Sequence, residues 1–243
     1  MKITDIRVLC LSRKHEPELV WFSSSFRVFK ADCPIVIIET DAGIQGISEP
    51  STYGNAPYMK KRIEEMKPQL VGRDVEDPAL VSPHEGHREN DITTAGIELA
   101  LWDIRGKAAG KRVADLIIDQ IPGPARKPRE RFRLYASAGV QYDWDDNPES
   151  VIDEAVAMAN RGFTAYKMRI GTHWAWSGVT MDQFLQLLQN VTDAVGGRME
   201  LMLEGNSRFT EERANEPETG RLWKKLPARL LKPWPISSRF GHT

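Results

Sequence analysis

Three short apolar stretches alternate with two helical segments in the second half of the chain, and this alternation limits the folds open to it. The stretches are 132–136, 163–170 and 199–203, and the helical segments are 147–162 and 180–196. Buried parallel strands separated by helices have this pattern. It is typical of a parallel barrel or an open doubly wound sheet. No glycine-rich phosphate loop follows any of the stretches, which argues against a nucleotide-binding sheet.

Capping residues mark the ends of the two helices. Asn147 is the expected N-cap of the first helix, which ends at Gly162. Thr180 begins the second, with Gln183 completing a capping-box pattern. The apolar stripe of the second helix predicts its buried face: Phe184, Leu188, Val191 and Val195.

Charged side chains stand where two of the apolar stretches end. Lys167 and Arg169 close one stretch and Glu204 follows another. Residues two apart on a strand share a face, so Lys167 and Arg169 can reach one ligand. In a barrel of strands and helices this end carries the active site. The three side chains are therefore candidates for chemistry, and structural ion pairing is the alternative.

The first half of the chain has an α+β pattern. A strand over 2–11 and a hairpin over 34–49, turning at Gly43, precede helices that begin at Pro57 and at Thr93 or Thr94. The proline- and glycine-containing stretch 122–128 predicts a linker.

A polar and aromatic stretch, Ser12 to Lys30, connects the first strand to the hairpin. It contains Trp21 and Phe22. It is either a surface connection or a lid over a site, because long loops in compact domains often carry function.

Charge and cysteine content exclude some classes of protein. The net charge is -1, from 33 basic and 34 acidic residues, which gives no reason to expect binding to nucleic acid or an anionic membrane. No apolar run reaches the length of a membrane span, and residues 1–11 read as a strand and not as a signal peptide. We expect Cys10 and Cys33 to be buried free thiols of a cytoplasmic protein, and not a disulfide or metal pair.

Five stretches carry a resemblance to a known family: 36–49, 95–110, Tyr135-Ala136-Ser137, Lys167-x-Arg169 and Glu204-x-Asn206. In this order they resemble the enolase superfamily, specifically its mandelate racemase and muconate lactonizing branch, over residues 1 to about 212. The resemblance implies an α+β capping domain over 1–125 followed by an incomplete (β/α) TIM-type barrel. The first three β/α units would occupy 132–212, and an atypical tail 213–243.

The resemblance also implies a chemistry. Family members remove the proton next to a carboxylate, and Mg²⁺ stabilises the resulting enediolate. Arginine hardly deprotonates, so Arg169 is expected to bind the substrate carboxylate, acting as base only if its environment forces it to release a proton, while Lys167 transfers the proton. The implied site is catalytic Lys167 and Arg169, metal-binding Glu204, and substrate-binding Asn206, Ser137, Trp21 and Phe22.

The end of the chain departs from the family pattern. Residues 219–243 contain no Asp or Glu but six Lys or Arg and three Pro. A shifted reading frame near 212–220 is one interpretation, and a basic tail is the other. From Phe132 on there are too few residues for a barrel of about 250. We therefore expect further metal ligands to be missing and this chain alone to be inactive or nearly so.

Three functions follow from these observations. The leading one is an acid-sugar dehydratase or racemase-like enzyme, present as a truncated form. The second is a non-catalytic fragment that binds acid sugars or associates with partner subunits. The third is a muconate-type cycloisomerase or dipeptide epimerase, against which Arg169 argues. The resemblance implies a small carboxylate as ligand and a homo-oligomer.

Overall fold

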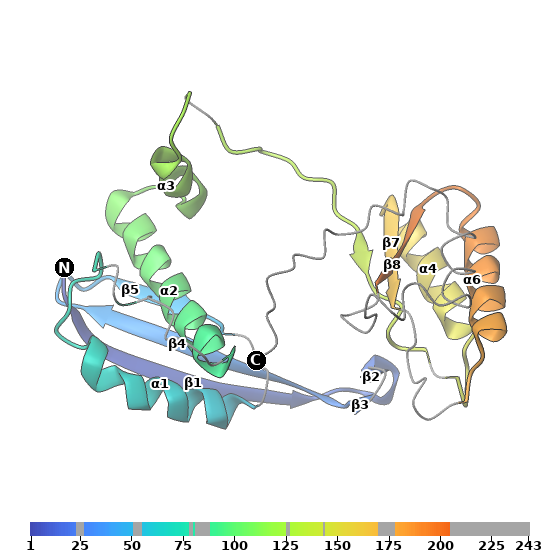
Figure 1. Ribbon diagram of the computed structural model, residues 1–243, viewed down its shortest axis with the longest axis horizontal. Helices are drawn as coiled ribbons and strands as arrows, with labels where there is room; N and C mark the ends of the chain where they lie inside the picture. Colours follow the sequence, from blue (N-terminus) through green and yellow to red (C-terminus); the bar gives the residue numbers. More distant parts are fainter. Residues whose placement is uncertain are drawn as a thin grey trace, which may run out of the picture. The chain divides into compact units, whose positions relative to one another are not determined.

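The structure is a computed structural model and describes residues 1–22, 27–50, 55–77, 80, 88–124, 127–142, 144–169 and 178–204. The chain divides into two compact units: residues 1–14 with 30–131, and residues 15–29 with those from 132 onward. Its helices and strands (Figure 1) are β1 (Ile3–Lys14), the 3₁₀ helix η1 (Pro17–Leu19), β2 (Trp21–Phe22), β3 (Arg27–Val28), β4 (Lys30–Thr40), β5 (Gln45–Ser48), α1 (Ala56–Leu70), α2 (Arg88–Ala109), α3 (Val113–Gln120), β6 (Ala136–Ser137), α4 (Ser150–Asn160), β7 (Ala165–Arg169), α6 (Met181–Val195) and β8 (Glu200–Glu204).

An antiparallel sheet with the order β1–β4–β5 forms the base of the first unit. The expected hairpin is confirmed: β4 turns into β5 at Gly43, which has φ +73° and donates its N–H to the Thr40 carbonyl over 3.0 Å. The β1–β4 ladder continues to the pair Lys14–Lys30. The loop predicted from Ser12 to Lys30 is therefore too long by several residues, because backbone pairing persists at both of its ends.

The cysteines lie in this extended part of the ladder. Both are free, as expected, but Cys10 is exposed and Cys33 is only partly buried. The prediction that both thiols are buried is wrong. Beyond Val8 the strand β1 has no buried residue, so the ladder there is open to solvent.

Helices α1 and α2 pack against this sheet (Figure 1). The side chain of Asn55 caps α1 by accepting the N–H of Tyr58 over 2.8 Å. Helix α2 begins at Arg88, so Thr93 and Thr94 lie inside it and are 0% and 5% exposed. The prediction that one of them caps the helix is wrong, because these side chains are part of the core. The core includes Val36, Ile38, Ile63, Ile97, Ala100, Leu101 and Ile104.

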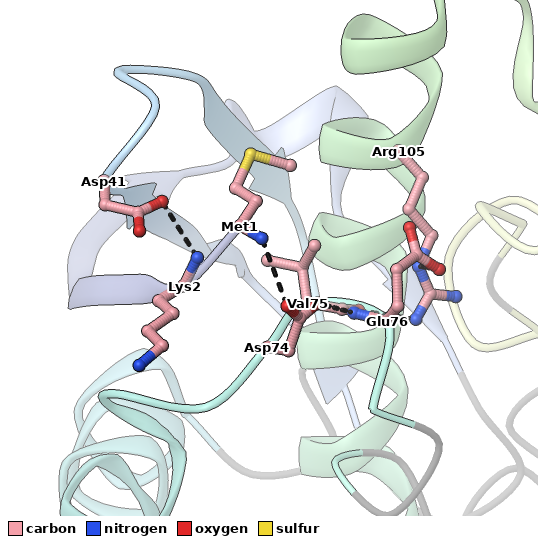
Figure 2. Close-up of polar contacts among 7 residues, drawn as sticks. All are labelled: Met1, Lys2, Asp41, Asp74, Val75, Glu76 and Arg105. Atoms are coloured by element: carbon pink, nitrogen blue, oxygen red, sulfur yellow. Dashed lines mark hydrogen bonds and ion pairs between the residues drawn. The ribbon is translucent and has the colours of Figure 1, made fainter.

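Polar contacts attach the first residues of the chain to the unit (Figure 2). The ammonium group of Met1 lies 3.1 Å from Oδ2 of Asp74, and the N–H of Lys2 donates to Asp41 over 2.9 Å. Arg105 on α2 donates to the carbonyl of Val75 over 2.6 Å. The segment around Asp74 is thereby held between the start of β1 and helix α2.

The second unit is built on a parallel sheet with the order β6–β7–β8, as the alternation of strands and helices predicts. Strand β6 is short, and the prediction of a strand over 132–136 is wrong. Phe132 and Leu134 are 70% and 69% exposed. Between them, Arg133 donates to Thr164 over 2.8 Å and to Glu200 over 3.1 Å, so a side chain and not a backbone ladder connects this stretch to the sheet.

Helices α4 and α6 lie side by side on one face of the parallel sheet (Figure 1). The capping box is confirmed at α6, where Thr180 and Gln183 exchange hydrogen bonds, and Gly196 ends the helix at φ +55°. The predicted cap at Asn147 is wrong. Its carbonyl accepts the N–H of Ser150 in a turn that precedes α4.

Two sequence predictions fall outside the described residues. These are the tail 213–243 and Asn206. Among the described residues, no helix combines the length and the apolar character needed to cross a membrane.

Candidate functional site

Strand β7 directs its side chains alternately to two faces of the sheet. Tyr166 and Met168 are 0% and 1% exposed and pack into the core with α4 and α6. Lys167 and Arg169, which alternate with them, are partly exposed. The two predicted catalytic residues thus share the sheet face that the helices leave open.

Neighbouring strands add two further predicted residues to this face. Ser137 on β6 pairs in register with Lys167, and Glu204 on β8 pairs with Arg169. Because paired residues of parallel strands point the same way and Lys167 and Arg169 are two residues apart, the four side chains share one face of the sheet as two adjacent pairs. Arg169 and Glu204 stand at the C-terminal ends of their strands, where β/α folds place their active sites.

An ion pair joins the two strand ends. Nε of Arg169 lies 3.3 Å from Oε2 of Glu204, and the two side chains are 17% and 26% exposed. The guanidinium of Arg169 also lies over the ring of Trp21, 5.6 Å from its centroid. The structure therefore brings Trp21, Arg169 and Glu204 together, although they come from distant parts of the sequence.

An aromatic ring also lies beneath Lys167. The Nζ atom of Lys167 is 5.6 Å from the centroid of the Tyr135 ring. We did not predict this contact, although the sequence contained its signal. Tyr135 precedes Ser137 by two residues, which is the spacing that places two side chains on one face of an extended segment.

Trp21 and Phe22 occupy different surroundings. The N–H of Phe22 donates to the carbonyl of Val140 over 2.7 Å, which fixes β2 to the loop after β6. The Phe22 side chain is 4% exposed and lines a groove of about 650 Å³ with Tyr142 and Glu154, whereas Trp21 contacts Arg169. A role of Phe22 in substrate binding stays a prediction.

A buried polar network supports β7 from the helix side. Oε2 of Glu154 accepts the Tyr166 hydroxyl over 2.7 Å and the Gly139 N–H over 2.8 Å. Burial, followed by the nearby Glu154 carboxylate, raises the pKa of Tyr166 well above its ordinary value. Tyr142 donates its hydroxyl to the carbonyl of Arg169 over 3.1 Å. These supporting residues were not found from the sequence, because their pairing depends on the packing of α4 against the sheet.

The described residues do not by themselves make a Mg²⁺ site. Mg²⁺ prefers near-octahedral oxygen ligands. Within the described ranges, no three His, Cys, Asp or Glu residues gather as a metal cluster. Glu204 offers a carboxylate, but one of its oxygens is engaged by Arg169. The predicted supporting residue Asn206 lies outside the described residues.

Comparisons with known proteins agree with this architecture. The family model "Mandelate racemase / muconate lactonizing enzyme, N-terminal domain" matches residues 4–117. The chain is 30% identical over 221 residues to a D-galactarolactone cycloisomerase of Agrobacterium fabrum, covering 86% of this chain and 53% of the relative. It is 32% identical over 141 residues to a D-galactonate dehydratase of Verminephrobacter eiseniae, covering 54% of this chain and 33% of the relative. The chain thus spans about half or less of the length of these relatives.

A solved structure gives the same result for the fold. The dipeptide epimerase of Enterococcus faecalis V583, complexed with Mg and a dipeptide, superposes with a TM-score of 0.68 at 18% identity. The match covers 93% of this chain and 59% of that one. It shows that an α+β capping domain followed by β/α barrel units is a fold shared with that enzyme. The family-model match identifies residues 4–117 as the N-terminal domain of the mandelate racemase and muconate lactonizing enzyme branch, and the fold is that of an enolase-superfamily member from Polaromonas sp. JS666, which matches at 25% identity with a TM-score of 0.69 over 88% of this chain and 54% of that one.

Proposed function

We propose that the protein acts on an acid sugar by removing the proton next to its carboxylate, as a dehydratase or a racemase-like isomerase. The observation that carries this proposal is the placement of two adjacent pairs, Ser137–Lys167 and Arg169–Glu204, on the open face of the parallel sheet. The sequence relatives include enzymes named D-galactarolactone cycloisomerase and D-galactonate dehydratase. The carboxylate of an acid-sugar substrate matches the two cationic side chains of this group, Lys167 and Arg169.

Lys167 is the residue we assign to proton transfer. As a neutral amine it would take the α-proton, while the C–H electron pair moves into the carboxylate to give an enediolate. In a dehydration, the hydroxyl on the next carbon then leaves as water after protonation. The partly exposed side chain above Tyr135 is within reach of a ligand on the open face.

Arg169 is the residue we assign to the carboxylate. Its planar guanidinium matches a carboxylate geometrically and keeps its charge, so it suits binding better than proton abstraction. Bound Mg²⁺, which the resemblance implies, would stabilise the enediolate as a Lewis acid. Glu204 is the predicted ligand for such an ion, and one of its oxygens is already engaged by Arg169.

Exchange of the α-proton tests the proposal directly. The chain is incubated in D₂O with D-galactonate, with and without Mg²⁺, and loss of the α-proton signal and formation of a dehydrated product are followed by NMR. Because we expect this chain alone to be inactive or nearly so, slow exchange over a long incubation is the readout, and we expect Lys167→Met to abolish it. Lys60→Met on α1, which removes an exposed lysine of the first unit, should leave it unchanged. Exchange that survives in Lys167→Met contradicts the assignment.

Binding without chemistry is the second candidate function. The ion pair between Arg169 and Glu204 favours this second function. The pair leaves the Arg169 guanidinium able to bind a carboxylate, but it occupies one oxygen of Glu204, the predicted metal ligand. Galactonate binding with no exchange or dehydration at any metal concentration would support this reading. Assembly with further copies, which the family resemblance implies, is measured in the same samples by light scattering.

A further inference from the structure

The surroundings of Arg169 contain an unused hydrogen-bond donor. Its Nε is paired with Glu204, and Trp21 covers the guanidinium plane. Its Nη1 is buried and has no hydrogen-bond partner in the described part of the chain. A buried N–H of a charged group without a partner is destabilising, so its presence in a fold calls for an explanation, and a ligand that accepts its hydrogen bond is one.

We propose that Trp21, Arg169 and Glu204 form a preorganised anion site that binds a carboxylate without a divalent cation. In this site Nη1 of Arg169 donates to the ligand carboxylate. Glu204 is a positioning residue that fixes the guanidinium and is not a metal ligand. The identity of the anion as an acid sugar rests on the proposed function, whereas the site itself rests on the geometry of the three side chains.

The register of β7 and β8 explains why Glu204 forms an ion pair with Arg169. The two residues are direct partners on β7 and β8, so their side chains leave the sheet next to each other. Their 3.3 Å contact is formed by groups that are mostly withdrawn from solvent, where screening is weak. A divalent cation at Glu204 would have to share the carboxylate with this guanidinium.

Trp21 supplies the second constraint on the guanidinium. The ring quadrupole attracts an arginine that lies over an aromatic face. Strand β2 is itself anchored, because Phe22 donates its backbone N–H to Val140. The backbone carbonyl of Arg169 accepts a hydrogen bond from the Tyr142 hydroxyl, which fixes its position. Arg169 thus has little freedom left, and a ligand that binds Nη1 loses little affinity to ordering it.

Calorimetric titration of D-galactonate into the chain in excess EDTA tests the site. We expect saturable binding in EDTA and no binding of D-galactose, which lacks the carboxylate. Arg169→Lys should weaken binding at least tenfold, and Glu204→Gln and Trp21→Leu severalfold. Arg161→Lys is the matched control and should leave binding unchanged, since Arg161 also lies over a ring, 5.9 Å from the centroid of Phe163, but outside the site.

Metal binding separates the two roles of Glu204. Mn²⁺ is titrated by electron paramagnetic resonance into the unmodified chain and into Glu204→Gln, with thermal unfolding as the check that the variant folds. We expect equal Mn²⁺ affinity in both. Galactonate binding that requires Mg²⁺, or a tenfold loss of Mn²⁺ affinity in Glu204→Gln, overturns the proposal.

The outcome is distinguishable from failure of the proposed function. Binding in EDTA without α-proton exchange supports the anion site and removes the proposed catalysis. If α-proton exchange requires Mg²⁺ and galactonate does not bind in EDTA, the proposed catalysis is supported and the metal-free anion site is contradicted.

Discussion

The two compact units differ in where they place their charged groups. In the first unit, ion pairs such as Arg7–Glu39 and Lys67–Asp5 lie on the surface, above a core of aliphatic side chains. In the second unit, polar groups reach into the packed interior, as Glu154 does to Tyr166, and across the open sheet face, as Arg169 does to Glu204. Apolar packing orders both units, and the second unit in addition holds polar contacts between its helices and its sheet and on the open sheet face.

The largest effect should come from filling a close approach in the first unit. A Cβ added at Gly46 on β5 would lie 2.1 Å from the carbonyl oxygen of Ala100 and 2.6 Å from Cγ1 of Ile104. We expect Gly46→Ala to lower the free energy of unfolding by about 3 kcal/mol, because α2 must move away from the sheet. Urea denaturation measures this loss. Gln45→Ala, at the exposed neighbouring position, is the control, and equal losses in the two variants would contradict close packing as the cause.

The buried polar network of the second unit gives the next largest effect. Glu154→Ala leaves the Tyr166 hydroxyl and the Gly139 N–H without their acceptor. We expect a loss of about 2 kcal/mol in the free energy of unfolding. Glu154→Gln keeps an oxygen that can accept both bonds and should lose much less. If the two variants are equally unstable, the carboxylate charge is what matters and not hydrogen bonding.

Alkaline pH should weaken the second unit. Burial raises the pKa of Tyr166 above its ordinary 10.0, so the folded chain keeps the phenol proton that the unfolded chain releases. Its contribution to stability is complete below pH 10 and declines as the pH rises, by up to about 1.4 kcal/mol per pH unit. Unfolding measured between pH 9 and 11 should show this slope in the unmodified chain and less of it in Tyr166→Phe. Equal slopes would contradict the assignment.

Acid pH should act on the first unit. A hydrogen bond from Lys67 lowers the pKa of Asp5, and hydrogen bonds from Lys30 and Ser12 lower that of Asp32. The folded chain therefore releases these protons more readily than the unfolded chain does. The contribution of both groups is present above their ordinary value of 3.8 and is lost as the pH falls below it. Hydrogen exchange of peptides from β1 and β4 should accelerate over this range, and a smaller acceleration is expected in Asp5→Asn.

The smallest effect is expected where the second unit uses a surface contact. Arg133 donates hydrogen bonds to Thr164 and Glu200, where β7 and β8 begin, and its side chain is 55% exposed. Arg133→Ala should lower the free energy of unfolding by about 0.5 kcal/mol, since exposed ion pairs contribute little. Arg131→Ala, two positions earlier, is the control. A loss above 2 kcal/mol in the free energy of unfolding would show that the Arg133 contact replaces the backbone ladder that residues 132–135 do not form.

Local patterns predicted the elements well where the responsible residues are close in sequence. The capping box of Thr180 and Gln183 and the turn at Gly43 form within four residues, and both are present. The stripe of Phe184, Val191 and Val195 is buried as its spacing predicts. Such features depend on backbone geometry that a short segment sets by itself.

Predictions failed where packing overrides a local preference. Thr93 is a favourable cap in isolation but lies inside α2, where the core surrounds it. The stretch that begins at Phe132 has the composition of a strand but forms only the two residues of β6. A strand requires a partner along its whole length, and composition does not supply one.

For the candidate site, the sequence by itself determined the residue types, their two-residue spacing on β7 and the position of Glu204 at a strand end. Strand periodicity alone places Lys167 and Arg169 on one face. Only the tertiary structure decided what these side chains contact. The segment 15–29 joins the second unit, Trp21 covers Arg169, and Glu204 pairs with the guanidinium. These contacts link residues far apart in the chain. The strand register and the packing that create them arise only when the segment 15–29 folds together with the residues from 132 onward.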